Sequence, residues 1–187
     1  ASRTYLELIG EEHLSFLLRR KTSKMRLSIA SICLFLGTDL DLTKTSSMTD
    51  ANIWAYPTTD FNRFYDPIFR GELPDLDFFF LSSPSLKDPG SPDGPPPGHD
   101  TLELVTLAPY EPFAAWEGAK SMRRGDEYEA FKERLLDRYL TQVERFVPSI
   151  RAHLKVAEVA TPVTNVTYAT APRGSIYGPE STPDQIG

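Results

Sequence analysis

The stretch "MRLSIASICLFLG" (residues 25–37) has the pattern of a long β-strand. In its first half Met25, Leu27 and Ile29 alternate with charged or small polar residues. Alternation with a period of two is typical of a strand with one buried face. Its second half, "ICLFL", is apolar at every position, which is typical of a strand covered on both faces. We therefore expect a strand over 25–37 that enters a sheet and becomes covered on both sides.

Further strand-like segments follow along the chain. They are residues 52–57, 75–83, 100–110 and 155–162. In the third of these, Leu102 and Leu104 are expected on one face and Val105 and Leu107 on the other. Each segment is separated from the next by turn-rich or helical sequence, so a sheet of about five strands is predicted.

Helical periodicity is clearest in residues 126–147, where an apolar stripe lies opposite a charged face. A second helix is expected over 3–20, with a break at Gly10. A short helix should begin at an N-cap at Thr59 or Asp60. Another should start with Thr161 as N-cap and continue to about Ala171.

Strands that follow one another with few crossover helices favour an α+β fold with a mixed, largely antiparallel sheet flanked by helices. The whole chain, 1–187, is predicted to form a single domain. Residues 84–99 are so rich in proline and glycine that we expect a surface loop without helix or strand.

The charge distribution limits the partners. A formal net charge of −6 argues against a nucleic-acid-binding protein. Residues 1–37 nevertheless carry 6 basic and 3 acidic side chains, with a basic run near Arg19. This run is expected to be either a solvated helix end or a contact for anionic lipid headgroups.

The chain has one cysteine, Cys33, so an internal disulfide is excluded and a reducing compartment is expected. Its apolar run is about 11 residues long, too short to cross a bilayer. We expect a cytoplasmic protein, with peripheral membrane contact left open. Cys33 itself is predicted to be an inert, buried thiol.

Sequence motifs for catalysis or metal binding are missing. His13, His99 and His153 have no metal-like spacing, and neither G-x-S-x-G nor G-x-x-x-x-G-K occurs. We therefore predict no metal site and assign no catalytic residue. Glu117 is conceivable as an acid, but an exposed glutamate is the more common explanation.

Aromatic residues are concentrated in or beside the predicted strands. They belong either to the core or to the wall of an apolar ligand pocket: Trp54, Tyr56, Phe78, Phe79, Phe80, Phe113 and Trp116. Composition leaves both interpretations open.

Several segments, in order, resemble the phytoene desaturase-like flavoproteins, which include carotenoid desaturases, carotenoid isomerases and retinol saturases. The segments are "ASICLFLGTDLDL", "NIWAYP", "FLSSPSLKDPG", "TLELVTLAPYEPFAAWEG", "VAEVATPVTNVTYATAPRGSIYG" and "TPDQIG". The resemblance covers nearly the whole chain. Its most specific pieces are "LFLG", "SSPS" with "DP", "WEG", and "ATPVT" followed by "GSIYG".

The resemblance implies a fold like the substrate domain of amine-oxidase-like flavoproteins and an apolar polyene substrate, such as a carotenoid or retinoid. It implies desaturation, saturation or isomerisation with FAD as the cofactor of the longer parent protein. Trp54, Tyr56, Phe78 and Phe80 are then expected to contact the substrate. A second set of residues is expected to lie near the flavin: Thr161, Gly174, Tyr177 and Gly178. The alternative is a turn that does not contact the cofactor.

The family binds FAD through a G-x-G-x-x-G turn, and this sequence has none. We therefore expect a fragment that is inactive alone and binds no FAD tightly. Residues 172–187 would link it to a missing FAD-binding domain, and exposed apolar surface would allow a homodimer. The rival hypotheses are a stand-alone lipid- or isoprenoid-binding protein and a protein-interaction module.

Overall fold

A computed structural model describes residues 2–75, 77–119 and 123–186 of the chain. Leu76, which belongs to the strand predicted over 75–83, lies outside the described residues. Residues 1 and 187 also lie outside the described residues. They are the two ends of the predicted domain, and residue 187 is also the end of the predicted link.

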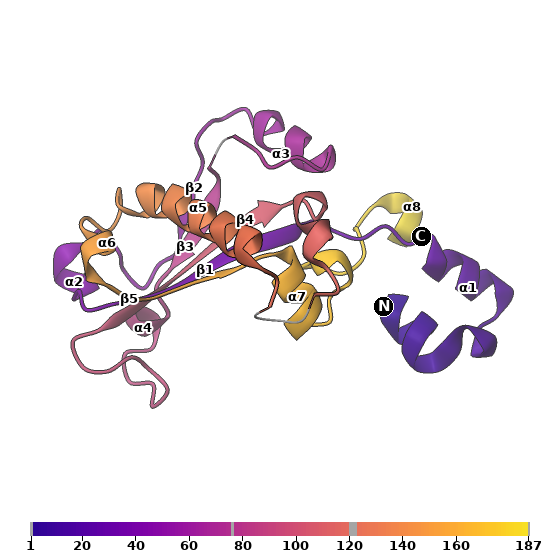
Figure 1. The fold of residues 1–187 in the computed structure, drawn as a ribbon, viewed down its shortest axis with the longest axis horizontal. Coiled ribbons are helices and arrows are strands. Elements are labelled where there is room, and N and C mark those ends of the chain that lie inside the picture. The colour runs from indigo at the N-terminus through magenta and orange to yellow at the C-terminus, as the bar shows by residue number, and fades with distance from the viewer. Residues whose placement is uncertain (1, 76, 120–122, 187) are drawn as a thin grey trace.

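Five strands form one open sheet in the order β2-β3-β4-β1-β5 (Figure 1). Their bounds are Ala30–Thr38 for β1, Ile53–Ala55 for β2, Phe79–Ser82 for β3, Asp100–Ala108 for β4 and Leu154–Ala160 for β5. Every neighbouring pair among these described strands is antiparallel. The predicted α+β class with a five-stranded sheet flanked by helices is therefore confirmed.

One face of the sheet carries the main core. Helix α5 (Asp126–Val143) lies along this face (Figure 1) and buries the predicted apolar stripe, including Leu135, Tyr139 and Val143. The strands contribute the even-numbered residues of β1 and β4. Among them are Ile32, Leu34, Leu36, Leu102 and Leu104, all 3% exposed or less.

The opposite face is only partly covered, so the prediction that β1 is buried on both sides is wrong. Cys33 is half-buried and Phe35 is 45% exposed. Helix α3 (Asn62–Phe69) covers one end of this face, where Phe64 and Ile68 pack on Phe78. The strand also begins at Ala30 rather than at residue 25.

The short elements match the sequence in part. Helix α7 (Pro162–Tyr168) has the predicted N-cap: Thr161 and Thr164 form a reciprocal capping box. Helix α3 instead begins after Phe61, although Asp60 accepts a hydrogen bond from the Asn62 N–H. Within the predicted loop 84–99, residues Pro84–Lys87 form a helical turn, α4, because proline is compatible with the first helical position.

The N-terminal segment is helical but divided. A π-helical segment, η1 (Thr4–Gly10), a 3₁₀ turn, η2 (Glu11–His13), and helix α1 (Phe16–Ser23) follow one another. The expected break at Gly10 is confirmed by its φ of 95°. None of the described helices combines the length and apolar character that crossing a membrane requires.

The remaining helical segments are short connections: α2 (Leu42–Thr45), η3 (Glu111–Trp116), α6 (Ile150–His153), η4 (Pro172–Gly174) and α8 (Pro183–Ile186). None of them was expected as a separate helix except the turn near α6. Three of them, α2, η3 and α6, adjoin the ends of strands, whereas η4 and α8 follow α7.

The two faces of β1 predict unequal costs for adjacent substitutions. Leu34→Ala should lower the free energy of unfolding by about 3 kcal/mol, because it leaves a cavity in the core. Phe35→Ala, one residue later on the open face, should cost about 1 kcal/mol or less. Urea denaturation of both variants measures the difference. Equal costs would mean that the second face is covered.

Candidate ligand-binding face

One residue from each strand lines up in a row across the open face of the sheet. Trp54 lies opposite Phe80, and Phe80 lies opposite Val105. Val105 lies opposite Cys33, and Cys33 lies opposite Ala160. All five side chains are apolar, and we call them the apolar row. Because neighbouring strands are about 4.8 Å apart, the row is about 19 Å long.

The apolar row is accessible to a ligand. Trp54 is 57% exposed, and the other four residues are half-buried. A strip of this length and composition suits an extended hydrocarbon better than a compact polar molecule.

The structure brings the four predicted substrate residues together at one end of the row. The ring centroids of Trp54 and Phe80 are 5.2 Å apart, and those of Tyr56 and Phe78 are 4.9 Å apart. Phe78 is only 6% exposed, because it lies beneath α3. Trp54, Tyr56 and Phe80 can therefore contact a ligand in this conformation, whereas Phe78 is buried and packs against Tyr56.

Sequence reasoning missed the other half of this face. Val105, Cys33 and Ala160 join the row only through strand pairing, which no local pattern in the sequence specifies. A second row beside the first is more polar, since Phe35 lies between Glu103 and Glu158. The face thus has an apolar strip with acidic side chains along one border.

The surroundings of Cys33 make its thiol a weaker acid than an exposed thiol. Burial raises the pKa of the Cys33 thiol, the hydrogen bond with Ser31 opposes this, and the Glu103 carboxylate raises it further. The thiol therefore stays protonated near neutral pH and acts as a small apolar group.

The residues predicted to lie near a flavin occupy two places: the turn between β5 and α7, and the segment that begins in η4. Thr161 is fully buried and its Oγ1 is 2.8 Å from the Tyr128 hydroxyl on α5. Its N–H also donates to Thr164 Oγ1 at 3.0 Å. Thr161 thus holds the turn between β5 and α7 in place.

Gly174, Tyr177 and Gly178 lie on a segment that returns along the start of β1. The Ser28 N–H donates to the Gly178 carbonyl at 2.8 Å, and the Ile176 N–H donates to the Ile29 carbonyl at 3.1 Å. Tyr177 is 76% exposed. Residues 26–30 and 175–180 therefore form two antiparallel arms that leave the sheet together. Whether they approach a cofactor stays a prediction.

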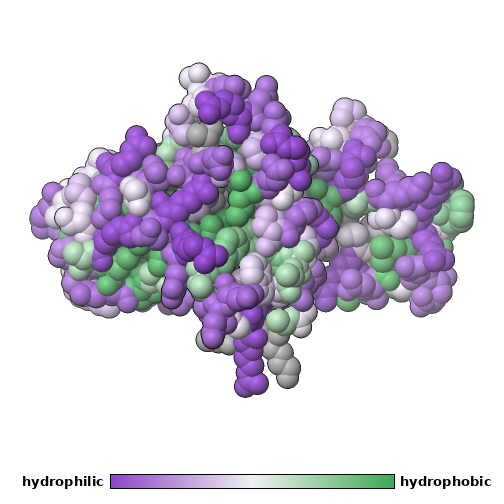
Figure 2. Space-filling view, turned by 45° about the horizontal axis from the view of Figure 1, so that its top comes forward, coloured by the Kyte–Doolittle hydropathy of each residue, from purple (hydrophilic) through white to green (hydrophobic). Residues whose placement is uncertain are grey.

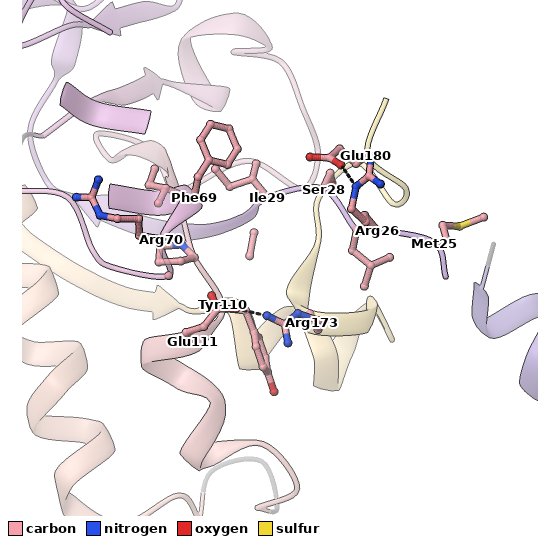
Figure 3. Close-up of a pocket in the computed structure, with 15 residues that line it drawn as sticks. Met25, Arg26, Ser28, Ile29, Phe69, Arg70, Tyr110, Glu111, Arg173 and Glu180 are labelled. Carbon is pink, nitrogen blue, oxygen red and sulfur yellow. Dashed lines mark hydrogen bonds and ion pairs between the residues drawn. The ribbon is translucent and has the colours of Figure 1, made fainter. Parts of the chain in front are cut away.

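A cavity of about 450 Å³ opens between these arms, the end of α3 and Tyr110 (Figure 3). Its arginines are each paired with carboxylates: Arg26 with Glu180 and Asp184, Arg70 with Glu72, and Arg173 with Glu111. Hydrogen bonds from Arg26 lower the pKa of Asp184 to about 2. Because these cations are already neutralised, the cavity offers an anion no unpaired arginine among its described lining residues.

The histidines and Glu117 lie outside the five strands, with His13 in η2, His99 before β4, His153 at the end of α6 and Glu117 after η3. His153 Nδ1 is 2.7 Å from Asp39 Oδ1, at the far end of β1. Glu117 is exposed after η3, as expected for a surface glutamate. In the described part of the chain, no group of three or more His, Cys, Asp or Glu side chains is arranged to hold a metal ion.

No protein-family model matches the chain. It is similar to all-trans-retinol 13,14-reductases. The protein of that name from Danio rerio is 28% identical over 165 residues, which are 86% of this chain and 27% of the relative. The Homo sapiens protein is 30% identical over 151 residues, 79% of this chain and 24% of the relative. The chain therefore spans about a quarter of the length of these curated relatives.

The two glycines of the returning segment provide a matched test of its packing. Gly174 has φ +64°, and an added Cβ would lie 2.4 Å from the Pro162 carbonyl oxygen. Gly174→Ala should lower the free energy of unfolding by about 3 kcal/mol, from left-handed strain plus a backbone clash. Gly178 has φ +70°, but an added Cβ there would meet nothing within 4 Å, so Gly178→Ala should cost about 1 kcal/mol.

Urea denaturation of both alanine variants checks this difference. Similar losses would contradict the close approach of Gly174 to the start of α7.

Proposed function

We propose that this chain is the substrate-binding portion of a flavin-dependent oxidoreductase that acts on a retinoid or a related apolar polyene. The apolar row is the observation that carries the proposal. It offers an elongated, partly exposed apolar strip, and a polyene is an elongated, rigid, apolar molecule.

The similarity to proteins named for a retinol reductase supports the substrate class. It extends over 79–86% of this chain, so it includes most of the sheet. The relatives' name is that of a reductase acting at positions 13 and 14 of all-trans-retinol, and reduction of a carbon–carbon double bond adds hydrogen across it. Saturation is therefore the reaction that we favour over desaturation or isomerisation, with carotenoids as a broader possibility for the ligand.

The described residues do not fit a flavin by themselves. The sequence lacks the glycine-rich turn that binds a dinucleotide, and the sheet is antiparallel, without the βαβ unit in which that turn occurs. We propose that FAD, which would supply hydride transfer, is held by another part of a longer protein. In that arrangement this chain binds and orients the polyene, as in the substrate domain of amine-oxidase-like flavoproteins.

The exposure of the row also bears on the rival hypotheses. A stand-alone lipid-binding protein should enclose its ligand, but Trp54 of the row is 57% exposed. The exposed rings of Trp54 and Tyr56 also fit a protein-interaction module. Direct ligand binding separates an interaction module from a polyene-binding face.

The row predicts binding of all-trans-retinol with a specific optical signal. The chain has two tryptophans, and Trp54 lies in the row while Trp116 packs against Phe131 of α5. Titration with all-trans-retinol should quench tryptophan fluorescence saturably, and Trp54→Phe should remove most of the quenching while Trp116→Phe does not. Val105→Asp should raise the Kd at least about tenfold, because contact with the polyene would desolvate a carboxylate.

Tyr168→Ser is the matched control, since Tyr168 is an aromatic residue on α7 whose exposure is similar to that of Trp54. Its Kd should be unchanged. Quenching that is not saturable, or that is insensitive to Val105→Asp in a folded variant, would argue against polyene binding on this face.

A further inference from the structure

Two carboxylates lie beside the apolar row on the open face of the sheet. Glu103 on β4 and Glu158 on β5 are directly opposite Phe35 of β1, one on each side of it. Residues directly opposite one another in an antiparallel pair point to the same face of the sheet. Both glutamates therefore share the open face with the apolar row, and we call the two of them the acidic border.

The acidic border is close to the half of the row that β4, β1 and β5 contribute. Glu103 is two residues from Val105, and Glu158 is two residues from Ala160. Since a strand rises about 3.3 Å per residue, each glutamate is about 7 Å from the row along its own strand. A ligand that covers this half of the row therefore passes both carboxylates.

The charge of the acidic border is not neutralised within the described part of the chain. Glu103 and Glu158 take part in none of the ion pairs among the described residues. Lys87 is an exposed cation that donates instead to the Asn52 side chain, just before β2 at the aromatic end of the row. The half of the row next to the border is thus exposed to uncompensated negative charge.

The Cys33 thiol shows how this part of the row treats a negative charge. Burial is the main cause that raises the pKa of Cys33, the hydrogen bond with Ser31 opposes it, and the Glu103 carboxylate raises it further. A raised thiol pKa means that the thiolate anion is disfavoured. The carboxylate of a ligand would meet the same two obstacles, namely loss of water on the apolar strip and repulsion by the border.

We propose that Glu103 and Glu158 make the apolar row selective for neutral polyenes over polyene carboxylates. The inference rests on the proposed function, because it concerns the ligand of the same face. The separation of about 7 Å is below the Debye length of about 10 Å at 0.1 M salt, so the repulsion reaches the row. A neutral alcohol is not repelled, and its hydroxyl can donate a hydrogen bond to a carboxylate.

Titrations with two ligands of the same carbon skeleton test this selectivity. All-trans-retinol is neutral, and all-trans-retinoic acid is a carboxylate at neutral pH. In low salt the unsubstituted chain should bind retinol at least about tenfold more tightly than retinoate, measured by tryptophan quenching. Glu103→Gln with Glu158→Gln should lower this ratio at least about fivefold by tightening retinoate, with the Kd for retinol unchanged. Added salt should also lower the ratio of the unsubstituted chain.

Glu127→Gln with Glu133→Gln is the matched control. It removes two exposed carboxylates from α5, which lies on the core face of the sheet. The change in net charge is the same as in the border variant, so the ratio should stay at the value of the unsubstituted chain. Circular dichroism should show that both double variants remain folded.

The titrations separate failure of the selectivity from failure of the proposed function. Absence of saturable retinol binding would overturn both. Saturable retinol binding with a ratio near one in the unsubstituted chain would overturn the selectivity alone, and so would equal changes of the ratio in the border variant and the control. Retinoate that binds as tightly as retinol and is weakened by Lys87→Gln would place the carboxylate at the aromatic end, contrary to the proposal.

Discussion

The antiparallel register of β1 with β4 and β5 is the constraint on which the rest of the structure depends. Leu34 pairs with Leu104 and with Val159, so all three side chains point toward α5. A shift of β1 by one residue would turn its own core side chains, such as Leu34, toward the open face and bring Cys33 and Phe35 into the core. Ile32, Leu34 and Leu36 are almost fully buried in the observed register, and exposing all three would be strongly unfavourable, so the register is well specified.

The same register that builds the core also builds the candidate site. A strand alternates its side chains, so fixing the core face fixes the opposite face as well. Residues as distant in sequence as Trp54 and Ala160 become parts of one strip. This arrangement explains how a ligand face can form without a local motif. It also gives the acidic border of the strip, because Glu103 and Glu158 flank Phe35.

The sequence predicted the elements whose signals are local. The alternation of Leu102 and Leu104 with Val105 and Leu107 indicated the two faces of β4, and Thr161 with Pro162 indicated the start of α7. The prediction failed for β1, because an apolar run looks the same whether its second face is buried or only half-covered.

The candidate site was predictable only at its aromatic end, where Trp54 and its neighbours stand out in composition. Val105 and Ala160 are ordinary strand residues whose place in the apolar row comes from their cross-strand neighbours. The two arms at 26–30 and 175–180 were missed for the same reason, since their pairing joins segments about 150 residues apart.

Mapping of methyl chemical shifts during titration with all-trans-retinol tests the central claim most directly, namely that the open face of the sheet binds an apolar polyene. The methyl resonances of Val105 and Ala160 should shift, whereas those of Leu104 and Val159, their sequence neighbours on the core face, should stay in place. Shifts confined to residues outside the apolar row, or no shifts at all, would contradict the claim.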